Sequence, residues 1–277
     1  MTTGARVTAL RRYPVKGCAG ELLTTTPIGV DGFPGDRLLA VTVGDRIVTQ
    51  REFARLALVR PALDDATGLL HLAYDGRDPV EAVVDTDRPT RTVTIFGNPV
   101  EVVDQDEVLS RWFGAVLGAA ARLVAAPPST RRTSPGEVEG QTLLSDEGTV
   151  SLHSEASLAR LNDALARRGH AALTSDRFRA NIVIDGVPAH AEDDAHLLDV
   201  GDVRMAFAQV DERCVVTTVD QQAGARSGPE PLRTLADYRR LDGGGVAFGI
   251  YTAVLAPGRV SVGDAVHLTR GRRTTGQ

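Results

Sequence analysis

A single cysteine lies between charged residues and a β-branched run in residues 210–220, which read VDERCVVTTVD. The thiolate of Cys214 would be a strong nucleophile and a soft ligand for a transition metal. A neighbouring cation such as Arg213 favours the ionised thiol. The alternative is that Cys214 begins a buried strand, since free cysteine is among the most often buried residue types. The segment therefore indicates either a metal or nucleophile site or a core strand.

A turn rich in proline and glycine follows an expected strand over residues 7–13. It reads PVKGCAG from Pro14 to Gly20 and brings Lys16 close to backbone amides. Such a turn can bind an anion. An ordinary loop with a solvated lysine is the alternative, because exposed lysines are common.

Two arginines and an asparagine, Arg177, Arg179 and Asn181, stand directly before and inside an apolar strand in residues 176–186. The guanidinium fork can donate two parallel hydrogen bonds to a planar anion. This segment therefore predicts a second contact for an anionic ligand.

The helix expected after residues 149–152 has an N-terminus that could hold a phosphate. Ser154 suits the N-cap, leucines form one apolar stripe, and Gly169 stands where the helix should end. Free amides and a partial positive charge favour an anion there, flanked by His153 and Ser154. The alternative is capping without a ligand.

Two further segments carry charges but predict no site. A cluster of acidic and histidine residues resembles metal ligands, and we interpret it as a solvated acidic loop; its members are His190, Glu192, Asp193, Asp194 and His196. Residues 127–140, PPSTRRTSPGEVEG, are expected to be a linker or mobile loop in which Arg131 and Arg132 are solvated, although this pair could bind an anion.

Composition excludes several classes of protein. The chain has 277 residues, 42% hydrophobic residues and a net charge of -5, which argues against a broad nucleic-acid surface. The first twenty residues lack the apolar core of a signal peptide. The most apolar later stretch, residues 114–126, is broken by Arg122 and is shorter than the roughly 18 residues of a membrane span. We expect a globular cytoplasmic protein with no nucleic-acid partner and no membrane segment.

The chain contains two cysteines, Cys18 and Cys214. A disulfide framework is therefore not expected, and a reducing compartment fits. An iron-sulfur cluster needs about four cysteine ligands, so we expect no such cluster in this chain.

The pattern of short alternating segments predicts a mostly β fold with few helices. Strands and turns alternate up to about residue 103, which suggests a small barrel or sandwich. An amphipathic helix follows over residues 106–117, its aromatic residues in the core. In the second half we expect strands over 203–210, 245–255 and 262–268, and a helix over 231–241 that begins with proline. A domain boundary near the 127–140 segment divides the chain into residues 1–125 and 126–277.

The chain resembles MOSC-domain proteins, and especially the amidoxime-reducing components and their bacterial relatives. The resemblance rests on motifs that occur in the family's order: YPVKGC from Tyr13, GDR at Gly35, SEASL from Ser154, FRAN from Phe178, RCVVTTV from Arg213 and FGIY from Phe248. It implies an α+β, mostly β fold, in which a small N-terminal β-barrel-like domain precedes a MOSC β-barrel domain with peripheral helices.

The resemblance also implies roles for single residues. Cys214 would ligate molybdenum in a molybdopterin cofactor and be the catalytic residue. The cofactor's pterin and phosphate would be bound by Lys16, Gly17, Arg37, Ser154, Arg179, Asn181, Arg213 and Tyr251. The sequence departs from the family pattern at three places, where Gly17 replaces a common serine, Ala180 a usual proline, and Asp211 a cysteine of some members.

The leading hypothesis is a molybdenum-dependent oxidoreductase that reduces N-hydroxylated or N-oxygenated small molecules. Its electrons would come from a separate flavin or iron-sulfur reductase, because no strand-glycine-helix fingerprint for a dinucleotide is present and Gly243–Gly245 lacks the required spacing. The alternative is a carrier or insertion protein for molybdenum cofactor or sulfur that uses Cys214. An apo-scaffold that binds a partner is a third possibility.

Overall fold

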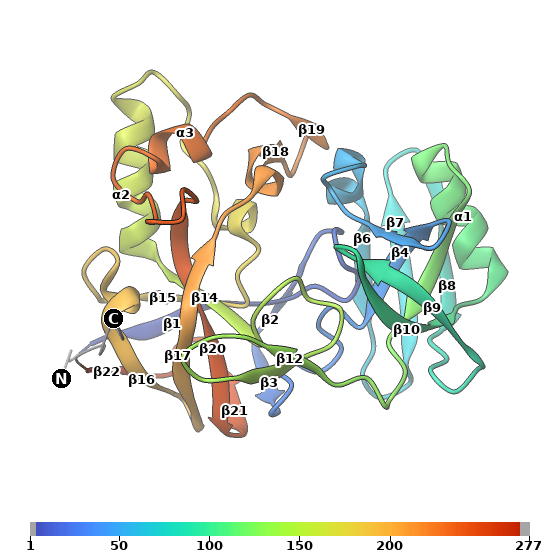
Figure 1. Cartoon of the computed structure of the whole chain (residues 1–277), viewed down its shortest axis with the longest axis horizontal. Helices are drawn as coiled ribbons and strands as arrows, with labels where there is room; N and C mark the ends of the chain where they lie inside the picture. The colour runs from blue at the N-terminus through green and yellow to red at the C-terminus, as the bar shows by residue number, and fades with distance from the viewer. Residues whose placement is uncertain (1–3, 272–277) are drawn as a thin grey trace.

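Two β-rich halves lie side by side in the computed structural model, which describes residues 4–271 (Figure 1). One half is an eight-stranded curled sheet, and the other contains a closed five-stranded barrel. The predicted mostly β fold with two barrel-like units is confirmed. Residues 1–3 and 272–277 of the two predicted domains lie outside the described range.

The large sheet is built from both ends of the sequence. Its strands, in spatial order, are β2 (Glu21–Leu23), β1 (Arg6–Arg12), β15 (Ile182–Asp185), β14 (Val150–Ser154), β20 (Ala247–Ala256), β17 (Val203–Glu212), β16 (Ala195–Val200) and β22 (Val266–Arg270). The barrel closes in the order β10 (Asn98–Asp104), β11 (Ala121–Ala125), β4 (Leu39–Val43), β5 (Arg46–Val48) and β9 (Thr90–Ile95).

Smaller sheets flank these two. A three-stranded sheet lies beside the barrel and consists of β6 (Arg60–Leu63), β7 (Leu69–Tyr74) and β8 (Arg77–Val83). Three two-stranded pairs are β3 (Thr25–Ile28) with β21 (Gly258–Ser261), β12 (Arg132–Ser134) with β13 (Gly140–Thr142), and β18 (Val219–Asp220) with β19 (Ala225–Arg226).

The first strands of the chain do not belong to the barrel. β1 pairs antiparallel with β15, with Val7 opposite Ile184, and β3 pairs with β21. The predicted boundary at residue 125 coincides with the end of β11, the last barrel strand in the sequence. Strand pairing nevertheless crosses that boundary, because alternation in a sequence predicts a strand without predicting its partner. β1 therefore belongs to the large sheet, although it precedes every barrel strand in the sequence.

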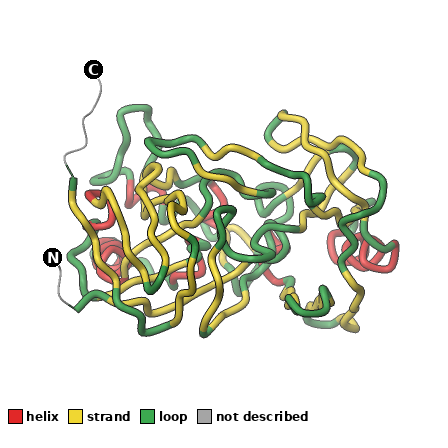
Figure 2. Tube along the Cα trace, turned by 90° about the horizontal axis from the view of Figure 1, so that it is seen from below, coloured by secondary structure: helices red, strands yellow, loops and turns green. Residues whose placement is uncertain are grey.

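The helix predicted over residues 106–117 is confirmed as α1 (Glu107–Leu117), at the right-hand end of the molecule in Figure 2. The Asp106 side chain accepts a hydrogen bond from the Val108 amide, and Gly118 ends the helix at φ 67°. Phe113 is fully buried in the hydrophobic cluster that joins α1 to the barrel and to the three-stranded sheet, as expected of this face.

Helix α2 (Glu155–Ala166) packs on the large sheet through its leucine stripe. Leu158, Leu161 and Leu165 are buried, and each contributes about 1.5–3 kcal/mol through removal of its side chain from water. The same cluster contains Phe178 and Phe248, whose rings stack at 4.0 Å. None of the helices in the described residues has the length and apolar character needed to cross a membrane.

Three predicted segments differ from the structure. The 127–140 segment is not wholly irregular, because β12 lies within it and Arg132 donates hydrogen bonds to the carbonyls of Leu143 and Ser145 at 3.0 and 2.7 Å. Arg132 is therefore not a solvated side chain. The helix predicted over 231–241 is only α3 (Leu232–Leu235), and the strand predicted over 262–268 begins at Val266. After α3 the chain runs through turns to an isolated β-bridge between Arg240 and Val246, and before β22 the chain turns at Gly263, which has φ 95°.

Candidate functional site

A cavity of about 290 Å³ is lined by residues from both halves of the chain. Among the lining side chains, six are lysine or arginine and four are aspartate or glutamate, so the cavity suits an anionic ligand. The lining residues are Lys16, Gly17, Arg37, Thr49, Gln50, Arg51, Ser145, Asp146, Glu147, Ser151, Arg177, Phe178, Arg179, Asp211, Glu212, Arg213, Cys214, Val216, Thr217 and Tyr251.

Cys214 lies just after β17 and precedes a short 3-10 helix, η4 (Val215–Thr218). The main chain is fixed there because the amide and hydroxyl of Thr217 both donate to the Cys214 carbonyl, at 3.1 and 2.9 Å. The thiol is half-buried and faces the cavity. The interpretation of Cys214 as the start of a buried strand is therefore wrong.

The cation that contacts the Cys214 sulfur is Arg51, not Arg213. Arg51 Nη2 donates to Sγ at 3.1 Å, and Arg51 Nη1 lies 3.3 Å from a carboxylate oxygen of Asp146. Arg213 instead donates to the carbonyls of Phe248 and Phe178, each at 2.8 Å. The prediction that Arg213 contacts the thiol, which was based on its adjacency in sequence, is therefore wrong.

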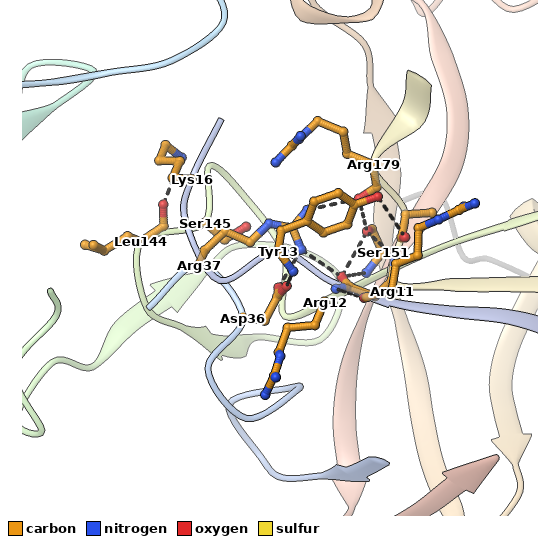
Figure 3. A network of polar contacts seen from close by, with 12 residues as sticks. Arg11, Arg12, Tyr13, Lys16, Asp36, Arg37, Leu144, Ser145, Ser151 and Arg179 are labelled. Carbon is orange, nitrogen blue, oxygen red and sulfur yellow. Dashed lines mark hydrogen bonds and ion pairs between the residues drawn. The ribbon is translucent and has the colours of Figure 1, made fainter. Parts of the chain in front are cut away.

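Two of the predicted anion-binding arginines hold one tyrosine ring between them. The guanidinium carbons of Arg37 and Arg179 lie 4.4 and 4.3 Å from the centre of the Tyr13 ring (Figure 3). Both arginines have left-handed backbones, with φ of 47° and 55°, which turn their side chains toward the cavity. Arg179 also donates to the Cys18 carbonyl at 2.6 Å. Cation–π contacts of this kind fix the arginines before a ligand arrives.

Asn181 and Gly17 shape the site in different ways. Asn181 is buried behind the cavity wall, and its Oδ1 accepts hydrogen bonds from Arg37 at 3.2 Å and from the Ser151 amide at 3.1 Å. It therefore positions Arg37. Gly17 lines the cavity at φ 83°, and its carbonyl accepts from Gln50 Nε2 at 2.8 Å.

Lys16, Asp146 and Arg51 form a charged group at one side of the cavity. Lys16 is ion-paired with Asp146 and donates to the Leu144 carbonyl at 2.8 Å. Burial lowers the pKa of Lys16, against the attraction of Asp146. Burial alone would raise the pKa of Asp146, but Lys16 and Arg51 outweigh it and hold that pKa below its usual value.

A second acidic side chain, Asp211, lies deep in the cavity wall. Its Oδ2 is 2.7 Å from Arg213 Nη2, and strand pairing between β17 and β20 brings it near Tyr251. Burial raises the pKa of Asp211 to about 7, with Glu147 adding to the rise and Arg213 opposing it. Burial likewise raises the pKa of Tyr251 well above its usual value, and Asp211 adds to this.

The predicted residues Lys16, Gly17, Arg37, Arg179, Arg213, Cys214 and Tyr251 meet in this cavity. Ser154 does not line it. Ser154 caps α2, and its amide donates to Glu192 Oε1 at 3.1 Å, while Ser157 Oγ donates to the same oxygen at 2.6 Å. A carboxylate of the chain thus occupies the helix N-terminus where we expected a phosphate, so the capping interpretation fits Ser154.

The cluster predicted as a solvated acidic loop is solvated only in part, since Asp194 and His196 are exposed while two of its carboxylates are buried. Glu192 and Asp193 are 0% and 7% exposed, and Asp193 forms an ion pair with Arg239 at 2.5 Å. The Glu192 carboxylate accepts hydrogen bonds from residues at the start of α2, and the Asp193 carboxylate pairs with an arginine. Within residues 4–271, no group of three or more histidine, cysteine, aspartate or glutamate side chains is arranged to hold a metal ion.

Sequence reasoning missed Arg51, Asp146 and Gln50 as members of the site. Arg51 reaches Cys214 across 163 residues, and Gln50 bonds to Gln221 across 171 residues. No local pattern marks these residues, because the contacts form only when the halves pack together.

The fold is that of a two-domain MOSC protein. The sequence matches the MOSC N-terminal beta barrel domain over residues 4–120 and the MOSC domain over residues 139–267. The chain therefore belongs to the MOSC-domain family.

Individual relatives fall into two groups. The chain is 32% identical over 275 residues to mitochondrial amidoxime-reducing component 1 of Homo sapiens, and the alignment covers 92% of this chain and 80% of that protein. The Mus musculus protein of the same name gives the same identity and coverage. The chain is also 30% identical over 266 residues to molybdenum cofactor sulfurase of Danio rerio, covering 89% of this chain and 32% of the sulfurase. The first group is named for amidoxime reduction and the second for a sulfurase of molybdenum cofactor.

Proposed function

We propose that this protein is a molybdenum-cofactor-dependent reductase of N-hydroxylated or N-oxygenated small molecules, supplied with electrons by a separate protein. The observation that carries the proposal is the Cys214 thiol, which faces a cation-rich cavity and accepts a hydrogen bond from Arg51 at 3.1 Å. The relatives named for amidoxime reduction support the reaction class.

The residues present fit a molybdopterin cofactor. A soft thiolate ligand suits molybdenum, and an anionic phosphate suits the lysine and arginines of the cavity. Cys214 would ligate the metal, while Lys16, Arg37 and Arg179 would hold the phosphate or pterin. Asn181 would act from behind the wall by orienting Arg37.

When bound, the cofactor would supply the two-electron reduction of the N–O group. Overall, an N-hydroxy group, two electrons and two protons yield an N–H group and water. The chain's own part is to bind and orient. Arg51 fixes the thiol with a charged hydrogen bond, and the Tyr13 ring keeps Arg37 and Arg179 in place. Asp211, whose pKa is raised to about 7 by burial, can hold a proton in the cavity wall at neutral pH.

Electrons would be delivered from outside, by a flavin or iron-sulfur reductase. The proposal is tested with the full chain made in a molybdopterin-competent host, by measuring molybdenum per chain and the reduction of benzamidoxime. We expect near-stoichiometric metal and turnover with reduced methyl viologen, and no sustained turnover with NADH or NADPH as sole donor. Absence of molybdenum, or full turnover with a nicotinamide alone, would contradict the proposal.

A carrier of molybdenum cofactor or sulfur is the second candidate, favoured by the sulfurase relatives. It would use Cys214 to hold cofactor or sulfur without turnover. Bound molybdenum combined with no reduction of any N-hydroxylated compound tried, and with transfer of cofactor to an apo-molybdoenzyme, would favour this candidate. We also propose a cytoplasmic location, which localisation of the tagged chain would test.

A further inference from the structure

Arg177 lies in the cavity wall with a donor that no protein group uses. It is the third residue of the short 3-10 helix η2 (Ser175–Phe178), and its side chain is only 8% exposed. Its Nη1 atom is buried and has no hydrogen-bond partner among the described residues. A buried guanidinium nitrogen normally finds an acceptor, because leaving a charged donor unpaired costs free energy.

The other arginines of the cavity are committed to oxygen or sulfur atoms of the chain. Arg37 donates to the Arg179 carbonyl, Arg179 to the Cys18 carbonyl, and Arg213 to two carbonyls. Arg51 donates to the Cys214 sulfur. Arg213 Nη2 also lacks a hydrogen bond but lies 2.7 Å from the Asp211 carboxylate, whereas Arg177 Nη1 is buried with neither a hydrogen bond nor an ion pair among the described residues.

The one acidic partner of Arg177 does not saturate it. Asp220 Oδ2 lies 3.4 Å from Arg177 Nη2, at the long end of a hydrogen bond. Asp220 Oδ1 is used within its own turn, where it accepts from the amides of Gln222 and Ala223 at 2.9 and 2.8 Å. Burial lowers the pKa of Arg177, while Asp220 and Asp176 oppose this.

We propose that Arg177, which lines this cavity, binds an oxyanion of a ligand there through its guanidinium group, whose Nη1 the chain leaves unpaired. The inference rests on the proposed function in taking this cavity as the cofactor site. A phosphate and a carboxylate share the required chemistry, a planar or tetrahedral oxyanion that accepts a charged hydrogen bond. The source is therefore either a phosphate of the bound cofactor or a carboxylate carried by the substrate.

The first experiment uses inorganic phosphate as the probe and cofactor-free full-length chain, so it does not depend on catalysis. Thermal midpoints measured over a phosphate series give an apparent Kd. We expect Arg177→Gln to weaken phosphate binding roughly tenfold, the loss typical of one charged hydrogen bond. Arg111→Gln is the matched control, because Arg111 lies on α1 with its side chain 73% exposed and should leave the Kd unchanged.

Asp220→Asn separates binding from a structural role. If Arg177 binds the anion, removing the competing carboxylate should tighten phosphate binding. If Arg177 only ties η2 to the β18 segment, Asp220→Asn should weaken phosphate binding as much as Arg177→Gln does. The second result would overturn the proposal, as would a phosphate Kd that is the same in wild type and Arg177→Gln.

Two further measurements on chain made in a molybdopterin-competent host identify the source of the oxyanion. A severalfold fall in pterin and molybdenum per chain in Arg177→Gln assigns it to the cofactor phosphate. Full cofactor content, with a roughly tenfold rise in the KM ratio of 4-carboxybenzamidoxime to benzamidoxime, assigns it to a substrate carboxylate. If neither changes, Arg177 contacts no oxyanion of the working enzyme and the proposal is wrong. If the protein has no reductase activity, the phosphate series and the cofactor content still test whether Arg177 binds an oxyanion.

Discussion

Arg51 and Cys214 are separated by 163 residues in the chain, and Arg51 Nη2 donates to the Cys214 sulfur at 3.1 Å. The same guanidinium lies 3.3 Å from Asp146 and stacks 4.6 Å from the centre of the Phe96 ring. A residue of the barrel half therefore fixes the thiol contributed by the other half. The cavity chemistry depends on how the halves pack.

We expect Arg51→Gln to lower kcat/KM for an N-hydroxylated substrate by about 10–100-fold, because a hydrogen bond to a charged group is worth about 1.5–3 kcal/mol. Arg51→Lys should restore little, since one ammonium cannot bridge both Asp146 and Cys214 as the planar fork does. Arg46→Gln, at an exposed position of β5, serves as the control. Steady-state kinetics at equal molybdenum content make the comparison, and unchanged kinetics in Arg51→Gln would show that the hydrogen bond is dispensable.

Local patterns predicted elements well and contacts poorly. Capping residues and apolar spacing located α1 and the start of α2, where Asp106 and Ser154 accept the expected amide hydrogen bonds. The pairing of β1 with β15 and the contact of Glu192 with Ser154 join residues far apart in sequence. Such contacts are decided by packing, which no local pattern encodes.

The sequence likewise predicted some of the site residues and not others. Motif resemblance named seven of the twenty residues that line the cavity, including Lys16, Arg37 and Cys214. It could not show that Asn181 acts through Arg37. Arg51 was not named at all, because an isolated arginine in a polar stretch looks like any solvated charge. Arg177 was indicated only as one of two arginines suited to an anion, without a role of its own.

The two cysteines should respond oppositely to replacement. Cys214→Ala removes the thiol that faces the cavity, so we expect loss of activity and weakened or redirected metal binding with the fold intact. Cys18 is 0% exposed in the same hydrophobic cluster as Phe113, and burial raises its pKa to about 12. Cys18→Ser should keep much of the molybdenum while costing about 1–3 kcal/mol of stability for a buried hydroxyl.

Metal analysis and denaturant unfolding of both variants test this contrast. Full reductase activity in Cys214→Ala would show that Cys214 is not the metal ligand. Loss of molybdenum in Cys18→Ser, with its stability unchanged, would show that the roles of the two thiols have been assigned wrongly.

Stability should fall as the pH is lowered through the range where the unfolded chain protonates His153. His153 is fully buried, its Nδ1 lies 3.1 Å from the Ser154 carbonyl and its Nε2 lies 2.9 Å from Ser175 Oγ. Burial lowers its pKa from 6.5 to about 4. Between these values the unfolded state binds more protons than the folded state, so unfolding becomes easier by about 3 kcal/mol.

Urea unfolding of wild type and His153→Gln between pH 7 and pH 4 measures this contribution. The variant should show a flatter dependence on pH, while His196→Gln, at an exposed position, should keep the wild-type slope. Equal slopes in all three proteins would mean that His153 is not held neutral by burial.

Asp211 should affect stability with the opposite sign. Its pKa is raised from 3.8 to about 7, mainly by burial, so the folded state binds its proton more tightly than the unfolded state does. The resulting stabilisation is fully present below pH 3.8 and is lost as the pH rises to about 7. Asp211→Asn cannot ionise, and it should therefore be more stable than wild type at pH 8 by roughly 4 kcal/mol, with the difference shrinking toward pH 4. Urea midpoints at pH 8, 6 and 4 make the measurement. A difference that is constant with pH, or a variant less stable than wild type at pH 8, would show that the Arg213 ion pair at 2.7 Å keeps Asp211 charged at little cost.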